Sequence, residues 1–448
     1  MFKKILIANR GEIALRILRT CREMGIPTVC IHSTIDSDAM HVRLADESVC
    51  VGPASSKDSY LNAQAILSAA EITGADAVHP GIGFLSENAE FAAMIEDHDL
   101  TFIGPCAEHI RVMGDKVEAK KTAKALGLPL VPGSDGAVSS LEEAEAVCAE
   151  IGYPVLIKAA AGGGGKGMQK VMCRQDLKEA LDLAQSEAKA NFGQGGVYVE
   201  KLLMDPQHIE VQILGDHWGN VVVLGDRDCS LQRRHQKIWE EGPSLIPTLV
   251  REDMQALCQQ AVQKLGYRNA GTLEFLYEDG NFYFIEMNTR LQVEHTVTEM
   301  ITGIDIVKQQ IIIAAQERLP WTQKEIRIQG HAIECRINAE HPETFLPQPG
   351  LVEAYTPPGG LHVRVDSALY QGYRVPAHYD SLVAKLIVYG DTRDECLARL
   401  AQALREYAIM GISTLVPLHM RLCQALPVKE GRITTGFLEE FLQSSSAV

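Results

Sequence analysis

One short stretch alternates functional groups with mostly apolar residues. Residues 285–295 read I-E-M-N-T-R-L-Q-V-E-H, and the alternate positions are Glu286, Asn288, Arg290, Gln292 and Glu294. Side chains alternate between the two faces of a strand, so an extended segment would place these groups on one face. On alternation alone, an antiparallel strand with one solvated face is the commoner explanation. The composition favours a site, because acids, amides and one arginine suit a hard metal ion beside an oxyanion.

The residues before this stretch predict a β-hairpin that would add a further carboxylate. A two-residue turn at Asp279-Gly280 would put Glu274 and Glu286 on opposite faces of the hairpin. A three-residue loop with Gly280 in the left-handed conformation would put them on the same face, and we expect this loop. Glu274, Glu286 and the carbonyl of Asn288 would then form an oxygen-ligand site for Mg²⁺ or Mn²⁺.

Length and composition exclude several classes of protein. A chain of 448 residues with 46% hydrophobic content predicts about three globular domains. The net charge of −16 argues against a nucleic acid or an anionic membrane as the main partner. The 11 cysteines form no C-x-x-C pair, and neither a signal peptide nor a membrane-spanning run is recognisable. We therefore expect a cytoplasmic protein with reduced thiols.

The chain opens with a β-α-β pattern. A buried-strand run at 3–9 precedes helical spacing over 13–24, and a second strand follows at 28–32. This order is typical of a parallel sheet and resembles a Rossmann opening. Because G-x-G-x-x-G is missing, a dinucleotide site is not expected.

Two further segments suggest anion binding. The glycine run at 159–168 is preceded by Lys158 and followed by a strand rather than a helix, so it is not a P-loop. A flap that folds over phosphates is favoured over a mobile linker. Residues 226–237 form a dense cation cluster, for which a solvated basic loop is an equally good explanation.

Three other segments have a predicted conformation. One helix opens at 114–116 and runs to 126, and a single helix is predicted for 301–315. Glu334, Arg336 and Asn338 would share one face of a strand.

Taken together, the motifs of the chain closely resemble those of the biotin carboxylase component of acetyl-CoA carboxylase, an ATP-grasp enzyme. The resemblance covers nearly the full length, and it rests on A-N-R-G-E-I-A at 8–14, H-P-G at 79–81, G-F-L-S-E-N at 83–88, M-G-D-K at 113–116, the glycine run, R-D-C-S at 227–230, Q-R-R-H-Q-K at 232–237, E-M-N-T-R at 286–290, Q-V-E-H at 292–295 and E-C-R-I-N at 334–338.

The resemblance implies an α/β fold of the ATP-grasp type. An N-terminal Rossmann-like domain would span 1–113, an ATP-grasp domain 114–329 with a small mobile lid at 131–203, and a C-terminal α+β domain 330–448. It also implies a homodimer that works with a biotin carboxyl carrier protein and carboxyltransferase subunits. The cofactors would be ATP and Mg²⁺ or Mn²⁺, expected as two ions, and carrier-bound biotin would be the substrate.

The same resemblance assigns roles by position. Metal binding falls to Glu274, Glu286 and Asn288, bicarbonate binding to Lys237, Arg290, Gln292 and Val293, and catalysis to Glu294 as general base together with Lys237, Arg290 and Arg336, which would also face the biotin ureido oxygen. ATP would contact Lys116, Lys158, Gly164, Gly165, Glu200, Lys201, Leu202, Leu203, His208, Gln232, His235, Glu274 and Glu286.

Some positions depart from the family pattern. Ile82 stands where Tyr is common, in a loop that borders the biotin site of relatives, which puts biotin affinity in question. Thr296 stands where Pro is usual, Ala161 shortens the glycine run, and Gly225-Asp226 replaces an Ala-Glu pair. None of these changes removes a predicted ligand of the metal, ATP or bicarbonate.

Two other functions fit part of this pattern. Another ATP-grasp ligase could form an acyl phosphate from a different carboxylic acid, although Lys237, Arg290 and Glu294 around a small pocket favour bicarbonate. A nucleotide-binding subunit without turnover would not need the intact set of acids and cations. Formation of ADP that depends on bicarbonate separates these functions.

Overall fold

The N-terminal segment folds as the parallel sheet that its β-α-β opening predicts. The computed structural model describes residues 1–159, 168–192 and 197–445. The sheet has the strand order β3-β2-β1-β4-β5, and its pairs are parallel. Its strands are β1 (Ile5–Ile7), β2 (Thr28–Ser33), β3 (Glu47–Gly52), β4 (Ala77–His79) and β5 (Thr101–Phe102). The helices of this region are α1 (Gly11–Glu23), α2 (Met40–Leu44), α3 (Ala63–Thr73), α4 (Ala89–Asp97), α5 (Ala107–Gly114) and α6 (Lys116–Leu126).

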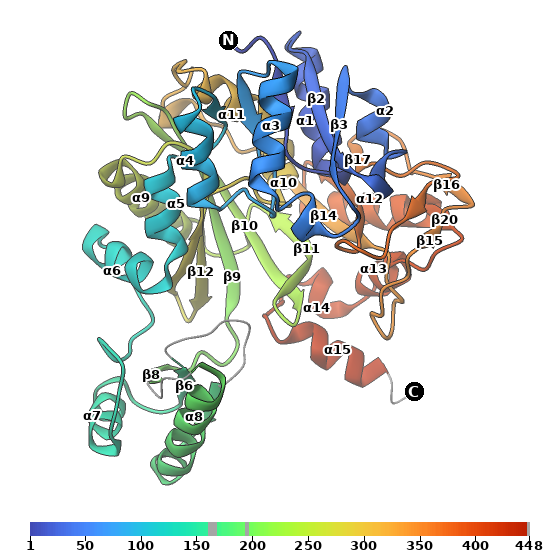
Figure 1. Cartoon of the computed structure of the whole chain (residues 1–448). Coiled ribbons are helices and arrows are strands. Elements are labelled where there is room, and N and C mark those ends of the chain that lie inside the picture. Colours follow the sequence, from blue (N-terminus) through green and yellow to red (C-terminus); the bar gives the residue numbers. More distant parts are fainter. Residues whose placement is uncertain (160–167, 193–196, 446–448) are drawn as a thin grey trace. The chain divides into compact units, whose positions relative to one another are not determined.

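A larger sheet follows, in the order β13-β12-β9-β10-β11-β14-β19-β17. Figure 1 labels β12, β9, β10, β11 and β14 of this sheet. Its strands are β9 (Gln207–Gly215), β10 (Val221–Arg233), β11 (Gln236–Gly242), β12 (Asn269–Glu278), β13 (Asn281–Asn288), β14 (His331–Asn338), β17 (Val363–Ser367) and β19 (Leu382–Gly390). A solvated basic loop was one of two explanations for the cation cluster at 226–237, and the structure instead gives this segment two paired strands. This segment belongs to the β10–β11 hairpin, whose turn residues Arg234 and His235 have φ values of 48° and 66°.

Three corrections concern the key stretch and its surroundings. The turn between β12 and β13 has two residues, Asp279 (φ 49°) and Gly280 (φ 82°), and not the expected three. The strand ends at Asn288, so the polar positions after it lie in a loop and not on an extended strand. The helix predicted for 301–315 is two helices, α10 (His295–Thr302) and α11 (Ile306–Ala314), because Gly303 adopts φ 70° and ends the first.

The remaining elements outside the second unit described below lie between and after the strands of the larger sheet in the sequence. They are α9 (Thr248–Leu265), β15 (Gly350–Leu351), β16 (Ala354–Thr356), β18 (Arg374–Val375), α12 (Arg393–Glu406), β20 (Ala408–Met410), α13 (Val416–Leu422), α14 (Leu426–Lys429) and α15 (Phe437–Ser445). Leu386, Val388, Leu400 and Leu404 are fully buried between β19 and α12, in a core that keeps β14 and β19 in register. No helix in the described part of the chain is both long and apolar enough to cross a membrane.

A second compact unit comprises residues 129–206 and 276–284. Its sheet has the order β7-β6-β8 and consists of β6 (Val155–Ala159), β7 (Met168–Val171) and β8 (Val197–Lys201), with α7 (Leu141–Ile151) and α8 (Leu177–Phe192) as its helices. β6 and β7 pair in antiparallel fashion, which confirms that the glycine run joins two strands. The predicted phosphate contacts of that run, Gly164 and Gly165, lie outside the described residues.

Candidate active site

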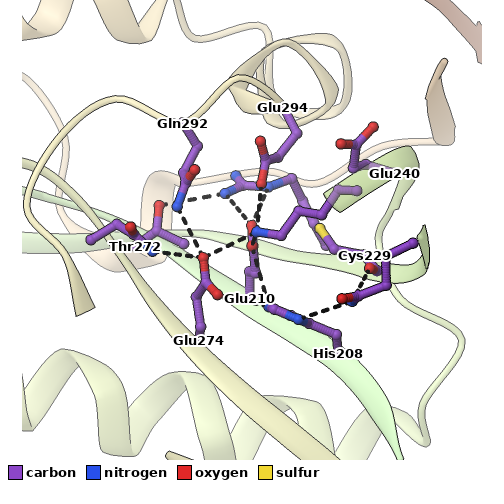
Figure 2. A network of polar contacts seen from close by, with 12 residues as sticks. His208, Glu210, Cys229, Glu240, Thr272, Glu274, Gln292 and Glu294 are labelled. Atoms are coloured by element: carbon purple, nitrogen blue, oxygen red, sulfur yellow. Dashed lines mark hydrogen bonds and ion pairs between the residues drawn. The ribbon is translucent and has the colours of Figure 1, made fainter. Parts of the chain in front are cut away.

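Lys237 lies at the centre of a buried cluster of carboxylates. It follows the β10–β11 turn, opposite Gln232. Its Nζ donates to Oε1 of Glu274 at 3.0 Å, to Oε1 of Glu294 at 2.9 Å and to Glu210. Figure 2 labels these three acids, which lie close together. Burial opposes the charged form, but the three carboxylates raise the pKa of Lys237 well above its usual value. The site therefore holds a permanent cation among three acids.

Glu274 collects donors from three different segments. Its Oε1 accepts hydrogen bonds from Asn288 at 2.6 Å and from Gln292 at 3.1 Å, while Nε2 of His208 lies 2.9 Å from its Oε2. Burial opposes ionisation, yet Lys237 and His208 hold the pKa of Glu274 well below its usual range. Burial likewise disfavours the imidazolium, but the charge of Glu274 raises the pKa of His208 to about 9. Both groups are ionised at neutral pH.

The contact between Glu274 and Asn288 also bears on the register of the hairpin. An uninterrupted ladder across a two-residue turn would place Glu274 opposite Ile285 and on the other face from Asn288. The hydrogen bond between the two side chains shows that the alternation is interrupted between turn and site. Glu274 thus contacts Asn288 of the polar stretch, although the three-residue loop that was expected to place it beside Glu286 was wrong.

Arg290 fixes the loop that follows β13. Its guanidinium donates to Oδ1 of Asn288 and to Oε1 of Gln292, both at 2.9 Å, and its Nε donates to Glu87 at 2.7 Å. Glu87 also accepts from the backbone N–H of Thr289 at 3.0 Å. These contacts belong to a loop and not to the strand that the alternation predicted. Arg290 nevertheless brings the side chains of Asn288 and Gln292 together, because it donates to both.

Arg336 approaches Glu294 from β14. Its Nη2 donates to Oε2 of Glu294 at 2.9 Å, while its Nε donates to Oε1 of Glu240 at 2.5 Å. Glu294, which occupies the N-cap position of α10, is therefore held between Lys237 and Arg336. Burial opposes ionisation, but Lys237 is the main cause of a lowered pKa of Glu294. The carboxylate is consequently anionic and paired on both oxygens.

Two buried acids beside Arg336 have pKa values above the usual value of a glutamate. Glu240 and Glu334 are directly opposite each other on β11 and β14. Burial raises the pKa of Glu240 to about 7 and that of Glu334 to about 8, with mutual repulsion contributing to the second. The hydroxyl of Thr296 donates to Glu334, a contact that the proline usual at this position could not make.

Three acids of this network had no role in the sequence-based prediction. Glu210 binds Lys237 and also Arg227, whose Nη2 donates at 2.9 Å. His208 and Glu210 are two positions apart on β9 and therefore share a face, which is a signal that the sequence contains. Glu87 accepts a hydrogen bond from Arg290, which is 203 residues away in the sequence, and Glu240 accepts one from Arg336, which is 96 residues away. The residues around Glu87 and Glu240 in the sequence do not reveal these contacts.

The donor set fits a divalent cation near Glu274. Burial, followed by the charge of Glu274, raises the pKa of Glu286, so a cation between the two carboxylates would relieve their repulsion. Lys116, which is exposed at the start of α6, lowers the pKa of Glu286 through its positive charge. His208, Glu210 and Glu274 form a second donor set whose ligand atoms lie within 4.8 Å of one another. The oxygen of Asn288 faces Arg290, so its amide would have to turn to bind a metal.

The predicted ATP contacts fall into groups. His208 and Gln232 meet, with Nδ1 and Nε2 3.3 Å apart, whereas His235 is exposed in the hairpin turn. In the second unit, Nζ of Lys158 donates to Glu200 at 2.5 Å.

Lys201 at the end of β8 and the two leucines that follow it differ in their contacts and exposure. The ammonium of Lys201 donates to the carbonyls of Gly152 and Tyr153, so it is engaged within its own unit. Leu202 is buried and Leu203 half-buried.

The chemistry available to this cluster follows from its charges. A paired, ionised carboxylate lies beside two cations that are able to bind a small anion. Neighbouring carboxylates and amides offer oxygen ligands for a divalent metal. Such a set is suited to deprotonating a bound oxyacid and to stabilising negative charge on transferring phosphoryl groups.

Three family models match the chain in succession. These are the biotin carboxylase N-terminal domain over residues 1–110, the ATP-binding domain of the carbamoyl-phosphate synthase L chain over 115–322, and the biotin carboxylase C-terminal domain over 334–440. Together they span most of its length.

Similar proteins cover the chain almost completely. The biotin carboxylase of Haemophilus influenzae is 55% identical over 444 residues, and that of Pseudomonas aeruginosa is 56% identical, with 99% of each chain covered in both comparisons. One pyruvate carboxylase subunit from Methanothermobacter thermautotrophicus is 49% identical, over 100% of this chain and 91% of that protein.

Solved structures show the same correspondence. A biotin carboxylase complex from Campylobacter jejuni is 48% identical and has a TM-score of 0.91, with coverage of 98% and 99%. The biotin carboxylase domain dimer of 2-oxoglutarate carboxylase from Hydrogenobacter thermophilus, bound to MgADP, ADP and bicarbonate, is 49% identical with a TM-score of 0.89 and 98% coverage of both chains. The chain therefore belongs to the biotin carboxylase family.

Proposed function

We propose that the chain carboxylates biotin on a separate carrier protein, using ATP and bicarbonate and passing through carboxyphosphate. The observation that supports this most is the placement of Glu294, an ionised carboxylate within 2.9 Å of both Lys237 and Arg336. A base and two cations are thereby assembled in one buried place. The family relationship supports the same activity, because relatives that cover the whole chain are biotin carboxylases.

Bicarbonate would be held by Lys237, Arg290, Gln292 and the backbone of Val293. In that position Glu294 removes its proton, which turns a poor nucleophile into a better one. The bicarbonate oxygen then attacks the γ-phosphorus of ATP, and the bond to the β-phosphate oxygen breaks to leave ADP. Lys237 and Arg290 stabilise the negative charge that spreads over the transferring group.

By the family resemblance, ATP would contact Lys116, Lys158, Glu200, Leu202, His208 and Gln232. Glu274, Glu286 and Asn288 would hold the metal, which when bound neutralises phosphate charge. The ionised state of Glu274 supports this assignment, as does the repulsion between Glu274 and Glu286.

Biotin would be carboxylated in the second step. Carboxyphosphate separates into CO₂ and phosphate, and the phosphate takes the proton of the biotin N1′. Arg336 stabilises the resulting negative ureido oxygen, and N1′ attacks CO₂ to form carboxybiotin. Arg336 suits this role because Glu240, its other partner, has a pKa of about 7 and is partly protonated at neutral pH.

The partners follow from the same proposal. A biotin carboxyl carrier protein would deliver the substrate, and carboxyltransferase subunits would consume the product. The relatives include a pyruvate carboxylase subunit and the biotin carboxylase domain of a 2-oxoglutarate carboxylase, so the proposal covers the half-reaction on biotin and no particular acceptor acid. We also propose a homodimer, the three domains at 1–113, 114–329 and 330–448, and a cytoplasmic location.

Release of ADP by the purified chain with Mg²⁺ and ATP tests the proposal, with bicarbonate and free biotin varied independently. We expect ADP release that requires bicarbonate and rises with biotin. Release that requires bicarbonate but ignores biotin would locate a defect at the biotin site, with Ile82 as the residue to exchange. Release that is indifferent to bicarbonate would contradict the proposal.

A further inference from the structure

A buried lysine lies directly beside Arg336. Lys385 of β19 is the cross-strand partner of Arg336 on β14, and its side chain is fully buried. Opposite residues of neighbouring strands point to the same face of a sheet. Lys385 therefore extends toward the same region as Arg336, although it has no part in the proton and phosphoryl transfers proposed for the site.

The ammonium of Lys385 contacts the backbone next to the proposed base. Its Nζ donates to the carbonyl oxygen of Val293 at 2.7 Å. That carbonyl and the N–H of Glu294 belong to one planar peptide group, so fixing the oxygen fixes the plane. Arg336 meanwhile holds the carboxylate of Glu294 at 2.9 Å. Two adjacent strand positions thus hold Glu294 at both ends, one through its backbone and one through its side chain.

We propose that Lys385 is a positioning residue, which orients the Val293–Glu294 peptide so that Glu294 meets the proton of bicarbonate. The proposal rests on the proposed function of the site. It gives Lys385 a part in the use of bicarbonate and none in the binding of nucleotide.

The charges around Lys385 agree with this role. Glu12 lies 3.6 Å from Nζ, which is beyond hydrogen-bonding distance, so the carbonyl of Val293 is the closer contact. Burial opposes the charged form, but Glu12, Glu334 and Asp366 outweigh it, and the pKa of Lys385 is raised, with Arg364 acting against them. Lys385 is accordingly a permanent donor at neutral pH.

Lys385→Met tests the proposal, because methionine keeps an unbranched chain of similar length without the donor. We expect kcat/KM for bicarbonate to fall about 30-fold, since misplacing a reacting group by about an ångström has effects of this order. The Kd of ADP, measured by calorimetry, should stay within about twofold of wild type. Equal losses in ADP affinity and bicarbonate use would overturn the proposal.

Two further variants separate positioning from general stability. Glu12→Gln removes the charge that faces Lys385 but not the contact with Val293, and we expect it to keep kcat/KM for bicarbonate within about threefold. Lys385→Arg retains charge and donors and should lose less than Lys385→Met. If the methionine variant does not fold, the arginine variant gives the test, and a loss that extends to ADP affinity would overturn the proposal.

A double-mutant cycle asks whether Lys385 acts through Glu294. In single turnovers of the Glu294→Gln protein, adding Lys385→Met should lower the rate by less than about threefold, because the base that Lys385 positions is already gone. Strictly multiplicative effects would overturn the proposal. Failure of the proposed function would be seen separately, as wild-type ADP release that does not respond to bicarbonate.

Discussion

Glu294 illustrates how strongly single contacts determine the chemistry of this site. Each of its two oxygens accepts a hydrogen bond of 2.9 Å, one from Lys237 and one from Arg336. The same two cations that keep the carboxylate ionised would bind or stabilise the reacting groups. Exchanging the base should therefore separate catalysis from binding.

Glu294→Gln is expected to lower turnover about 100-fold or more while leaving ATP binding intact, because the amide keeps the shape but accepts no proton. Bicarbonate-dependent ADP release and the Kd of ATP are the two measurements. Unchanged turnover would remove Glu294 as the base.

Lys237→Gln should mainly weaken the use of bicarbonate, since the variant loses the cation that would hold the anion. We expect the KM for bicarbonate to rise about tenfold or more. This KM is measured from the rate of ADP release over a series of bicarbonate concentrations. A KM at the wild-type value would show that the anion is bound elsewhere.

Much of the site could be predicted at the residue scale from the motifs that resemble those of the biotin carboxylase family, which assign roles to single residues. Lys237, Arg290, Glu294 and Arg336 all lie in the predicted cluster. Glu87, by contrast, reaches Arg290 from 203 positions away, and only the folded chain shows such a contact.

At the scale of secondary-structure elements, local sequence patterns predicted some strands and turns incorrectly. The alternation over 285–295 suggested one strand, but a loop held by Glu87 and Arg290 produces the same convergence. The hairpin register depended on a turn whose length the sequence left open, because Asp279-Gly280 suits both turn types. Helix α6, with Asp115 as its N-cap and Gly127 at its end, matched its prediction because its limits are set by local capping.

β14 yields a prediction about pH. Glu334 on this strand faces Glu240 of β11, Thr296 of α10, Lys385 of β19 and, along β14, Arg336. Its pKa of about 8 exceeds the usual value of 4.5, chiefly through burial. The folded state thus retains a proton that the unfolded state releases, and the free energy of unfolding falls as pH rises from about 4.5 to 8.

Glu334→Gln removes this contribution and still accepts the hydrogen bond of Thr296. We expect its stability relative to wild type to improve by about 3 kcal/mol between about pH 5 and 8.5. Urea unfolding at several pH values measures this difference. Parallel pH dependences of the two proteins would show that Glu334 is ionised throughout.

At the scale of the whole molecule, an exposed apolar surface bears on the proposed homodimer. A groove of about 410 Å³ lies between the loop at 359–363 and α12, lined in part by Leu361, Val363, Ala398 and Ala403. The side chain of Leu361 is 78% exposed. An apolar surface of this kind is a candidate for burial against a second copy.

Leu361→Asp should weaken self-association, because a desolvated carboxylate in such an interface is costly. Sedimentation equilibrium should give about twice 49.1 kDa for the wild type and a value close to 49.1 kDa for the variant. A variant that sediments like the wild type would place any dimer contact on another surface.

The pairing of Glu294 with Lys237 and Arg336 has a consequence for the hydrolysis of ATP in the absence of bicarbonate. A carboxylate paired with two cations is a weak base, so at rest it would draw few protons from water. Bicarbonate would compete with Glu294 for Lys237, and the weaker pairing would raise the basicity of Glu294 when the anion is bound. Hydrolysis of ATP without bicarbonate would therefore be slow. The protein would consume little ATP when its substrate is absent.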